Sequence, residues 1–219
     1  MLYCPIAGGK GRSMAKTIER YDLSFGTGAL LVREAVLLAE AREPGEAWED
    51  LRVRAIAQNL IQSRAARSTV RRTRAALKRI STLDDDEIDA LLDSTGTDRA
   101  LLMWAASCRA FTLIGEFAEE VLRERFLLLT PTVTYDEFDA FLSSKGAWHP
   151  ELADLAETTT KKLRETVFRM MLEADLLTTA GAIVPVVLPP RLASLLDTRD
   201  PSDLRFFPTR APMSGSEYR

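Results

Sequence analysis

The sequence is poor in the residues on which many catalytic and metal sites depend. Its 219 residues include 1 histidine and 2 cysteines, Cys4 and Cys108, which lie far apart. The cysteines form no metal motif and no disulfide framework, which fits a reducing compartment. The single histidine, His149, leaves little for histidine-based catalysis. Because no Ser-His-Asp or Cys-His arrangement is visible either, the sequence favours a protein that is not an enzyme and holds no metal or cofactor.

Long apolar runs are also missing. No stretch reaches the ~20 apolar residues that span a bilayer, and the longest candidates are residues 101–106 and the proline-interrupted residues 180–190. The N-terminus lacks the apolar segment of a secretory signal. We therefore expect a cytoplasmic protein. We also expect residues 1–20 to be a flexible extension, in which residues 1–13 are either native or the result of a misplaced start.

The alternation of apolar and polar residues that is typical of strands is nearly absent before residue 177. Hydrophobic residues make up 46% of the chain, which suffices for a sizeable core. The pattern predicts a mainly α protein with a helical unit over residues 21–130, a second unit over residues 131–208 and a tail over residues 209–219. Capping boxes are expected at Asp84 and Thr134, and Ser68 or Thr69 is expected to cap a basic helix that runs to Ile80. The other expected helices cover residues 34–41, 48–62, 84–93, 101–129 (buried, with a kink near Gly115), 134–144, 150–156, 158–175 (capped by Thr158–Thr160) and 191–196.

The second unit has the element order of a winged helix. A helix, a short helix and a longer helix are followed by Ala180-Gly181, which is typical of a β-hairpin turn. Pro185 would confine the following strand to an edge. The sequence thus predicts a winged-helix-like unit with a small β-hairpin.

The clearest signal is a stretch without acidic residues. The chain carries a net charge of −3, yet Asp and Glu are absent from Leu51 to Leu83. The same stretch contains nine basic residues: Arg52, Arg54, Arg64, Arg67, Arg71, Arg72, Arg74, Lys78 and Arg79.

Helical spacing separates these charges from an apolar face. Val70, Thr73, Leu77 and Ile80 would form one face of the helix, and the basic residues would cover roughly 160° of its surface, with Arg72 and Arg79 widening the arc. A second helix that follows a short turn is the layout that enters a DNA major groove. Because guanidinium groups bind phosphate through paired N–H donors, we predict duplex DNA contacts by Arg64, Arg67, Arg71, Arg72, Arg74 and Lys78.

A second, weaker set opens the helix that begins near residue 158. Hydroxyl and cationic side chains at a helix N-terminus suit phosphate, and this set comprises Thr159, Lys161, Lys162 and Arg164. The segment between Leu176 and Pro190 carries no Lys or Arg, so a wing that grips the DNA backbone is less expected.

Other interpretations stay open. The basic face could be solvated and paired with the acidic run at residues 84–89, it could dock an acidic partner subunit, or it could bind RNA. The segment Gly8-Gly9-Lys10-Gly11 lacks the frame of a phosphate-binding loop, and Asp84-Asp85-Asp86 is better explained by capping than by a metal.

The order of several short segments resembles the BrxA family of BREX bacteriophage-defence systems. The resemblance covers roughly residues 21–208 and rests on Tyr21-Asp22-Leu23-Ser24-Phe25, Gln58-Asn59-Leu60, Phe117, Pro150-Glu151-Leu152, Thr158-Thr159-Thr160-Lys161-Lys162-Leu163 and residues 168–176. It implies a cytoplasmic, all-helical DNA-binding protein with helix-turn-helix character. It also implies work beside a methyltransferase, an ATPase and a phosphatase-like protein, and it assigns no catalytic residues.

Overall fold

The computed structural model describes residues 19–210. The expectations for Cys4, for Gly8–Gly11, for residues 1–18 of the extension and for residues 211–219 of the tail lie outside this range. The described chain is mainly helical, as predicted, and its α-helices are α1 Val32–Ala41, α2 Trp48–Ala57, α3 Ala66–Ile80, α4 Asp85–Asp93, α5 Thr97–Ala110, α6 Thr112–Phe117, α7 Glu124–Leu127, α8 Tyr135–Gly146, α9 Pro150–Ala153, α10 Glu157–Glu173 and α11 Pro190–Asp197. Shorter elements are η1 Ser24–Gly26, η2 Ala118–Arg123 and η3 Asp203–Phe206.

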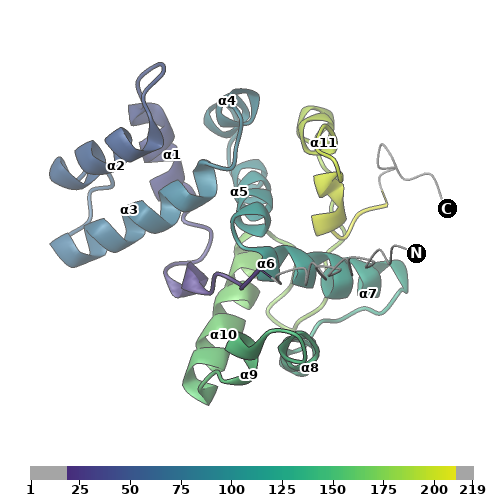
Figure 1. Cartoon of the computed structure of the whole chain (residues 1–219). Coiled ribbons are helices and arrows are strands. Elements are labelled where there is room, and N and C mark those ends of the chain that lie inside the picture. The colour runs from purple at the N-terminus through teal and green to yellow at the C-terminus, as the bar shows by residue number, and fades with distance from the viewer. Residues whose placement is uncertain (1–18, 211–219) are drawn as a thin grey trace, which may run out of the picture.

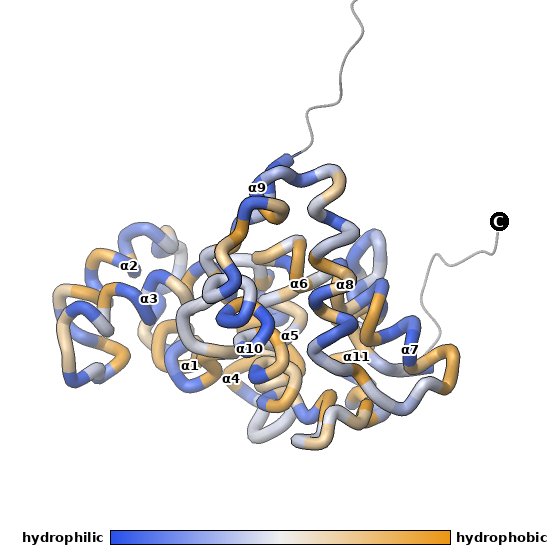
Figure 2. The backbone as a smooth tube through the Cα atoms, turned by 90° about the horizontal axis from the view of Figure 1, so that it is seen from below, coloured by the Kyte–Doolittle hydropathy of each residue, from blue (hydrophilic) through white to orange (hydrophobic). Residues whose placement is uncertain are grey.

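The helices are arranged around α5 (Figure 1). Helix α3 packs on α1, α2 and α5, while α10 packs on η1, α8 and α5. Helices α1–α3 lie to one side of the molecule. Figure 2 shows this part of the molecule from below, with hydrophilic and hydrophobic residues alternating along α2 and α3. The short element η1 joins the two predicted units, because it precedes α1 in the chain and packs against α10.

The ends of the helices agree only partly with the predicted caps. The capping boxes at Asp84 and Thr134 are confirmed. The predicted caps of the two basic helices are wrong. Helix α3 begins after Ala65 and α10 begins after Ala156, neither of which provides a capping side chain. Thr69 is buried instead, and its hydroxyl donates to Asn59 Oδ1 at 3.0 Å.

The predicted central helix over residues 101–129 is two segments. Phe111 leaves the helical conformation, with φ −137° and ψ 97°, and the axis turns by 116° between α5 and the run from α6 to α7. The bend that was predicted near Gly115 thus lies at Phe111, four residues earlier, and separates two helices. A Cβ at Gly115 would lie 2.9 Å from the carbonyl oxygen of Cys108, so glycine is needed there for close approach of α6 to α5.

The core predictions for this region are confirmed. Trp104, Phe111, Phe117 and Cys108 are buried, and burial raises the pKa of the Cys108 thiol. The indole Nε1 of Trp104 donates to the carbonyl of Phe206 at 2.9 Å, which ties η3 to α5. Within residues 19–210, only the bent pair of α5 with α6–α7, and no individual helix, has the length and apolar character of a membrane span.

The second unit keeps the predicted order of helices but lacks the predicted strands. The turn at Gly181 is present, with φ +78° and a hydrogen bond from Gly181 N to Thr178 O of 2.9 Å. Around it, the described residues form only two isolated antiparallel bridges, Thr132 with Ala182 and Leu177 with Ile183. The winged-helix assignment therefore stays a prediction.

Candidate nucleic-acid interface

Hydrogen bonds of Asn59, in the turn between α2 and α3, position the start of the basic helix. Asn59 and Gln62 adopt positive φ angles of 51° and 53°. The side chain of Asn59 donates to Ser63 O at 2.9 Å and accepts from Ser63 N at 3.0 Å. Because Asn59 also accepts from Thr69, the turn that carries Arg64 is tied to the first turns of α3.

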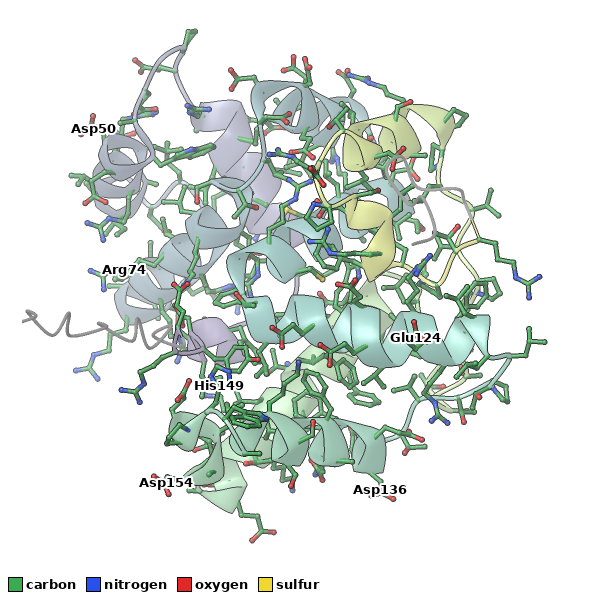
Figure 3. All side chains as sticks on the ribbon, turned by 45° about the vertical axis from the view of Figure 1, so that its right-hand side comes forward. Asp50, Arg74, Glu124, Asp136, His149 and Asp154 are labelled. Atoms are coloured by element: carbon green, nitrogen blue, oxygen red, sulfur yellow. The ribbon has the colours of Figure 1, made fainter. Side chains whose placement is uncertain are left out.

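Four basic residues form a row along the outer side of α3. At about 100° per residue, Arg67, Arg71, Arg74 and Lys78 lie within an arc of about 60°. By the same rotation, the centre of the row lies about 120° from the centre of the buried residues Thr73, Leu77 and Ile80. Figure 3 shows Arg74 on the outward side of α3, whereas Glu124 and Asp136 lie at the other side of the molecule. We call Arg64, Arg67, Arg71 and Arg74 the open arginines, because all four are exposed.

The open arginines have no ion-pair partner within residues 19–210. The acidic run at residues 84–89 pairs with other residues. Asp84 and Glu87 contact Arg199 at 2.8 Å, and Asp85 lies 3.6 Å from Arg42. Pairing of this run with the face of α3, one of the open interpretations, is not seen among the described residues.

Two of the residues predicted to bind phosphate form ion pairs with carboxylates of the chain itself. Arg72 pairs with Glu34, which is buried at the start of α1. Lys78 pairs with Asp22, just before η1. Burial raises the pKa of Asp22, but the hydrogen bonds from Lys78 and Ser24 outweigh it and lower that pKa to about 2. Asp22 is therefore a fixed negative charge at the end of the row.

The expectation that Arg79 widens the basic surface is wrong. Arg79 is 0% exposed and lies between α3 and α5, where its Nε donates to Ser107 Oγ at 3.2 Å. The helical rotation that places Arg71 and Arg74 outward turns Arg79 onto the flank that α5 covers. Helix α3 therefore presents a narrower row than the predicted arc.

A surface pocket of about 380 Å³ lies between α3 and η1. We call it the α3–η1 pocket. Its lining contains no Asp or Glu and comprises Ser24, Thr27, Arg67, Val70, Arg71, Arg74, Ala75, Lys78 and Phe111. Sequence reasoning missed the hydroxyls of Ser24 and Thr27. Their segment includes the run Tyr21–Phe25 that carries the family resemblance, but nothing in its pattern showed that it faces α3.

The residues of the second predicted phosphate-binding set, on α10, have different environments. Thr159, Lys161 and Lys162 are exposed on α10. Arg164 pairs with Asp139 of α8 and its guanidinium carbon lies 4.7 Å from the Tyr135 ring centroid, so it ties α8 to α10. Lys162 packs against η1, since a Cβ placed on Gly26 would lie 3.2 Å from its Cε. The fold thus places Lys162 beside the segment that forms one wall of the α3–η1 pocket.

The single histidine belongs to a separate polar cluster. His149 stacks on Tyr21 with ring centroids 4.2 Å apart, and its Nδ1 lies 3.1 Å from Glu151 Oε1. Tyr21 donates to Glu116 at 2.6 Å. The contacts of Tyr21 with His149 and Glu151 attach the first described residues to the second unit, whereas Glu116 belongs to the first unit. No cluster of His, Cys, Asp and Glu within residues 19–210 has the arrangement of a metal site.

Comparison with known proteins gives consistent matches over most of the chain. A family model described as BrxA matches residues 19–200. The chain is 23% identical over 159 residues to "BREX protein BrxA" of Paramagnetospirillum magneticum (strain ATCC 700264 / AMB-1), covering 73% of this chain and 80% of that protein. It is 24% identical over 172 residues to "BREX protein BrxA" of Escherichia coli O9:H4 (strain HS), covering 75% and 78%.

The fold is also that of a solved structure. The crystal structure of an uncharacterized protein from Magnetospirillum magneticum matches with a TM-score of 0.73 and 22% sequence identity, over 87% of this chain and 100% of that one. At this level of identity the likeness concerns the arrangement of the helices.

Proposed function

The chain belongs to the BrxA family, and from that premise we propose that it is a DNA-binding component of a BREX bacteriophage-defence system that catalyses no reaction itself. Its curated relatives carry the name BREX protein BrxA. The observation that carries the proposal is the group of open arginines, which combine exposure with the lack of any ion pair among the described residues.

Duplex backbone is the ligand that this surface suits best. Guanidinium groups bind phosphate oxygens through paired donors, and each phosphate that they neutralise releases condensed counterions. Arg67, Arg71 and Arg74 recur every three or four residues on one side of α3, so they can contact consecutive phosphates rather than base edges. Binding of this kind depends steeply on salt and little on sequence.

Charge reversal on the row tests the proposal. We expect Arg71→Glu/Arg74→Glu to weaken binding to a labelled random-sequence duplex by at least about 100-fold at low salt, because phosphate contacts are replaced by repulsion. Fluorescence anisotropy measures the affinity, and circular dichroism checks the fold. The matched control is Arg33→Glu/Arg169→Glu, with the same change of net charge at exposed positions that line a different pocket. Equal affinities of the wild type and the folded row variant would refute the proposal.

The two neighbouring lysines of α10 give a second test. Lys161 and Lys162 are both exposed, but Lys162 is the one that packs on η1. If the bound backbone extends from α3 across η1, Lys162→Glu should weaken binding about tenfold and Lys161→Glu about twofold, as measured by anisotropy. Equal losses would mean that α10 acts through net charge alone.

The same assays also detect two other ligands, RNA and an acidic partner subunit. RNA of equal length competes with the duplex if the surface binds RNA. An acidic partner subunit would be captured in a pull-down that survives nuclease, and Arg71→Glu/Arg74→Glu would lose it while duplex binding stayed unchanged. DNA-bridged association would instead vanish on nuclease digestion.

A further inference from the structure

The α3–η1 pocket differs in charge from other pockets of the described residues. Its lining combines four cations with two hydroxyl-bearing residues and contains no carboxylate. Three other pockets, of about 440, 560 and 570 Å³, each include at least two carboxylates. An anion would therefore be attracted to the α3–η1 pocket more strongly than to these three.

Directly behind this pocket lies a buried charge, Arg79, that forms no ion pair among the described residues. Arg79 donates from Nη1 to Ala75 O at 2.5 Å, and its Nη2 has no acceptor. Its guanidinium carbon is 5.2 Å from the centroid of the Phe111 ring, and Lys78 Nζ is 4.7 Å from the same centroid. Ala75 and Phe111 both line the pocket, so they form the wall between it and Arg79.

Such a charge costs stability unless something compensates it. Taking an ion out of water is costly, and even a buried ion pair can often be replaced by well-packed apolar residues of similar volume without loss of stability. Burial lowers the pKa of Arg79 to about 10, so the group is still charged near neutral pH. Within residues 19–210, no carboxylate lies close enough to form an ion pair with it, although the negative charge of Glu173 acts on it from farther away and offsets part of the cost of burial. A negative ion in the pocket would offset this charge through a wall of low dielectric constant, where screening is weak.

We propose that the α3–η1 pocket is a discrete phosphate site, and that Arg79 is a buried positioning charge that strengthens phosphate binding from behind the wall. The inference rests on the proposed function, in which the phosphate belongs to the backbone of the bound DNA. It adds that one phosphate is held in a defined place, between the arginines of α3 and the hydroxyls of Ser24 and Thr27.

Thermal unfolding of the full chain tests the site with inorganic phosphate as the probe. Sodium phosphate should raise the Tm by about 2–4 °C relative to sodium chloride at equal ionic strength, since a ligand that binds only the folded state stabilises it. Arg71→Gln/Arg74→Gln should lose this phosphate-dependent shift. Arg191→Met, which removes an exposed cation of α11, should keep it. A wild type that responds equally to the two salts would overturn the phosphate site.

Arg79→Met tests the buried charge. In chloride its Tm should equal or exceed that of the wild type, because Ser107 keeps its hydrogen bond to Met103 O (2.7 Å) and no polar group is newly orphaned. Most of the rise in Tm that the wild type shows in phosphate relative to chloride should be lost in this variant. A clearly lower Tm in chloride, or a full phosphate shift, would overturn the role given to Arg79.

Duplex binding by the same variants separates this inference from the proposed function. Arg79→Met should weaken duplex binding about 3- to 10-fold. If it loses the phosphate shift but binds duplex like the wild type, the site takes free phosphate and its link to DNA is wrong. If the phosphate shift is absent while Arg71→Glu/Arg74→Glu still abolishes duplex binding, the discrete site fails and the proposed function stands.

Discussion

Neighbouring arginines of α3 have different environments. Arg71 is exposed without an ion pair among the described residues, whereas Arg72 pairs with the buried Glu34. A rotation of about 100° per residue separates the two side chains. The outward row was predictable because spacing alone determines it. The partners of Arg72 and Lys78 were not, because Glu34 and Asp22 reach α3 only through the tertiary fold.

Asp22 limits the basic surface at its Lys78 end. We expect Asp22→Asn to tighten duplex binding about 3- to 10-fold at low salt, because it removes a repulsive charge and releases Lys78 for a phosphate. The amide oxygen of the variant can still accept from Ser24 N, which in the wild type lies 2.7 Å from Asp22 Oδ1.

Anisotropy titrations compare this variant with Asp93→Asn, which makes the same charge change and releases Arg191 of α11. The control should bind like the wild type. Unchanged or weaker binding by Asp22→Asn would show that Lys78 is not part of the DNA surface.

At the scale of helices, the two capping boxes were predictable, because the paired residues lie within one turn, whereas the single-residue caps expected for α3 and α10 were wrong. The capping box of α4 joins Asp84 and Glu87, three residues apart, and was predicted. The position of the break, at Phe111, was not, because no proline or glycine marks it. Its ring is buried and packs edge-on against Phe25 with centroids 5.4 Å apart. Long-range packing, which the sequence does not reveal, therefore sets the bend between α5 and α6.

Gly115 allows the two arms of this bend to approach each other. We expect Gly115→Ala to destabilise the fold by about 1–3 kcal/mol, because the added methyl would overlap the carbonyl of Cys108. Urea unfolding followed by circular dichroism measures the change.

Gly146→Ala is the matched control. Gly146 ends α8, and a Cβ there would make ordinary contacts of 3.6–3.8 Å with Ala153 of α9. Stability should therefore stay within about 1 kcal/mol of the wild type or rise. A Gly115→Ala variant as stable as this control would mean that α6 can shift away from α5 at little cost.

At the scale of the whole molecule, a net charge of −3 conceals a strongly uneven distribution. The sequence predicted the basic segment and the mainly helical fold, but not how its two basic sets are related. They approach each other through η1, a segment near the start of the described chain that Lys162 of α10 contacts and that lines the pocket beside α3. Proximity of segments so far apart in sequence follows from the tertiary fold alone.

The salt dependence of duplex binding tests the central claim most directly. For the full chain on a random-sequence duplex, the open arginines predict a slope of about −3 to −4 for log K against log salt, at about −0.9 per phosphate. Arg71→Gln should reduce the steepness of that slope by about 0.9, and a second random duplex should give the same line. A slope near zero, or one that Arg71→Gln leaves unchanged, would contradict the claim that these arginines bind DNA phosphates.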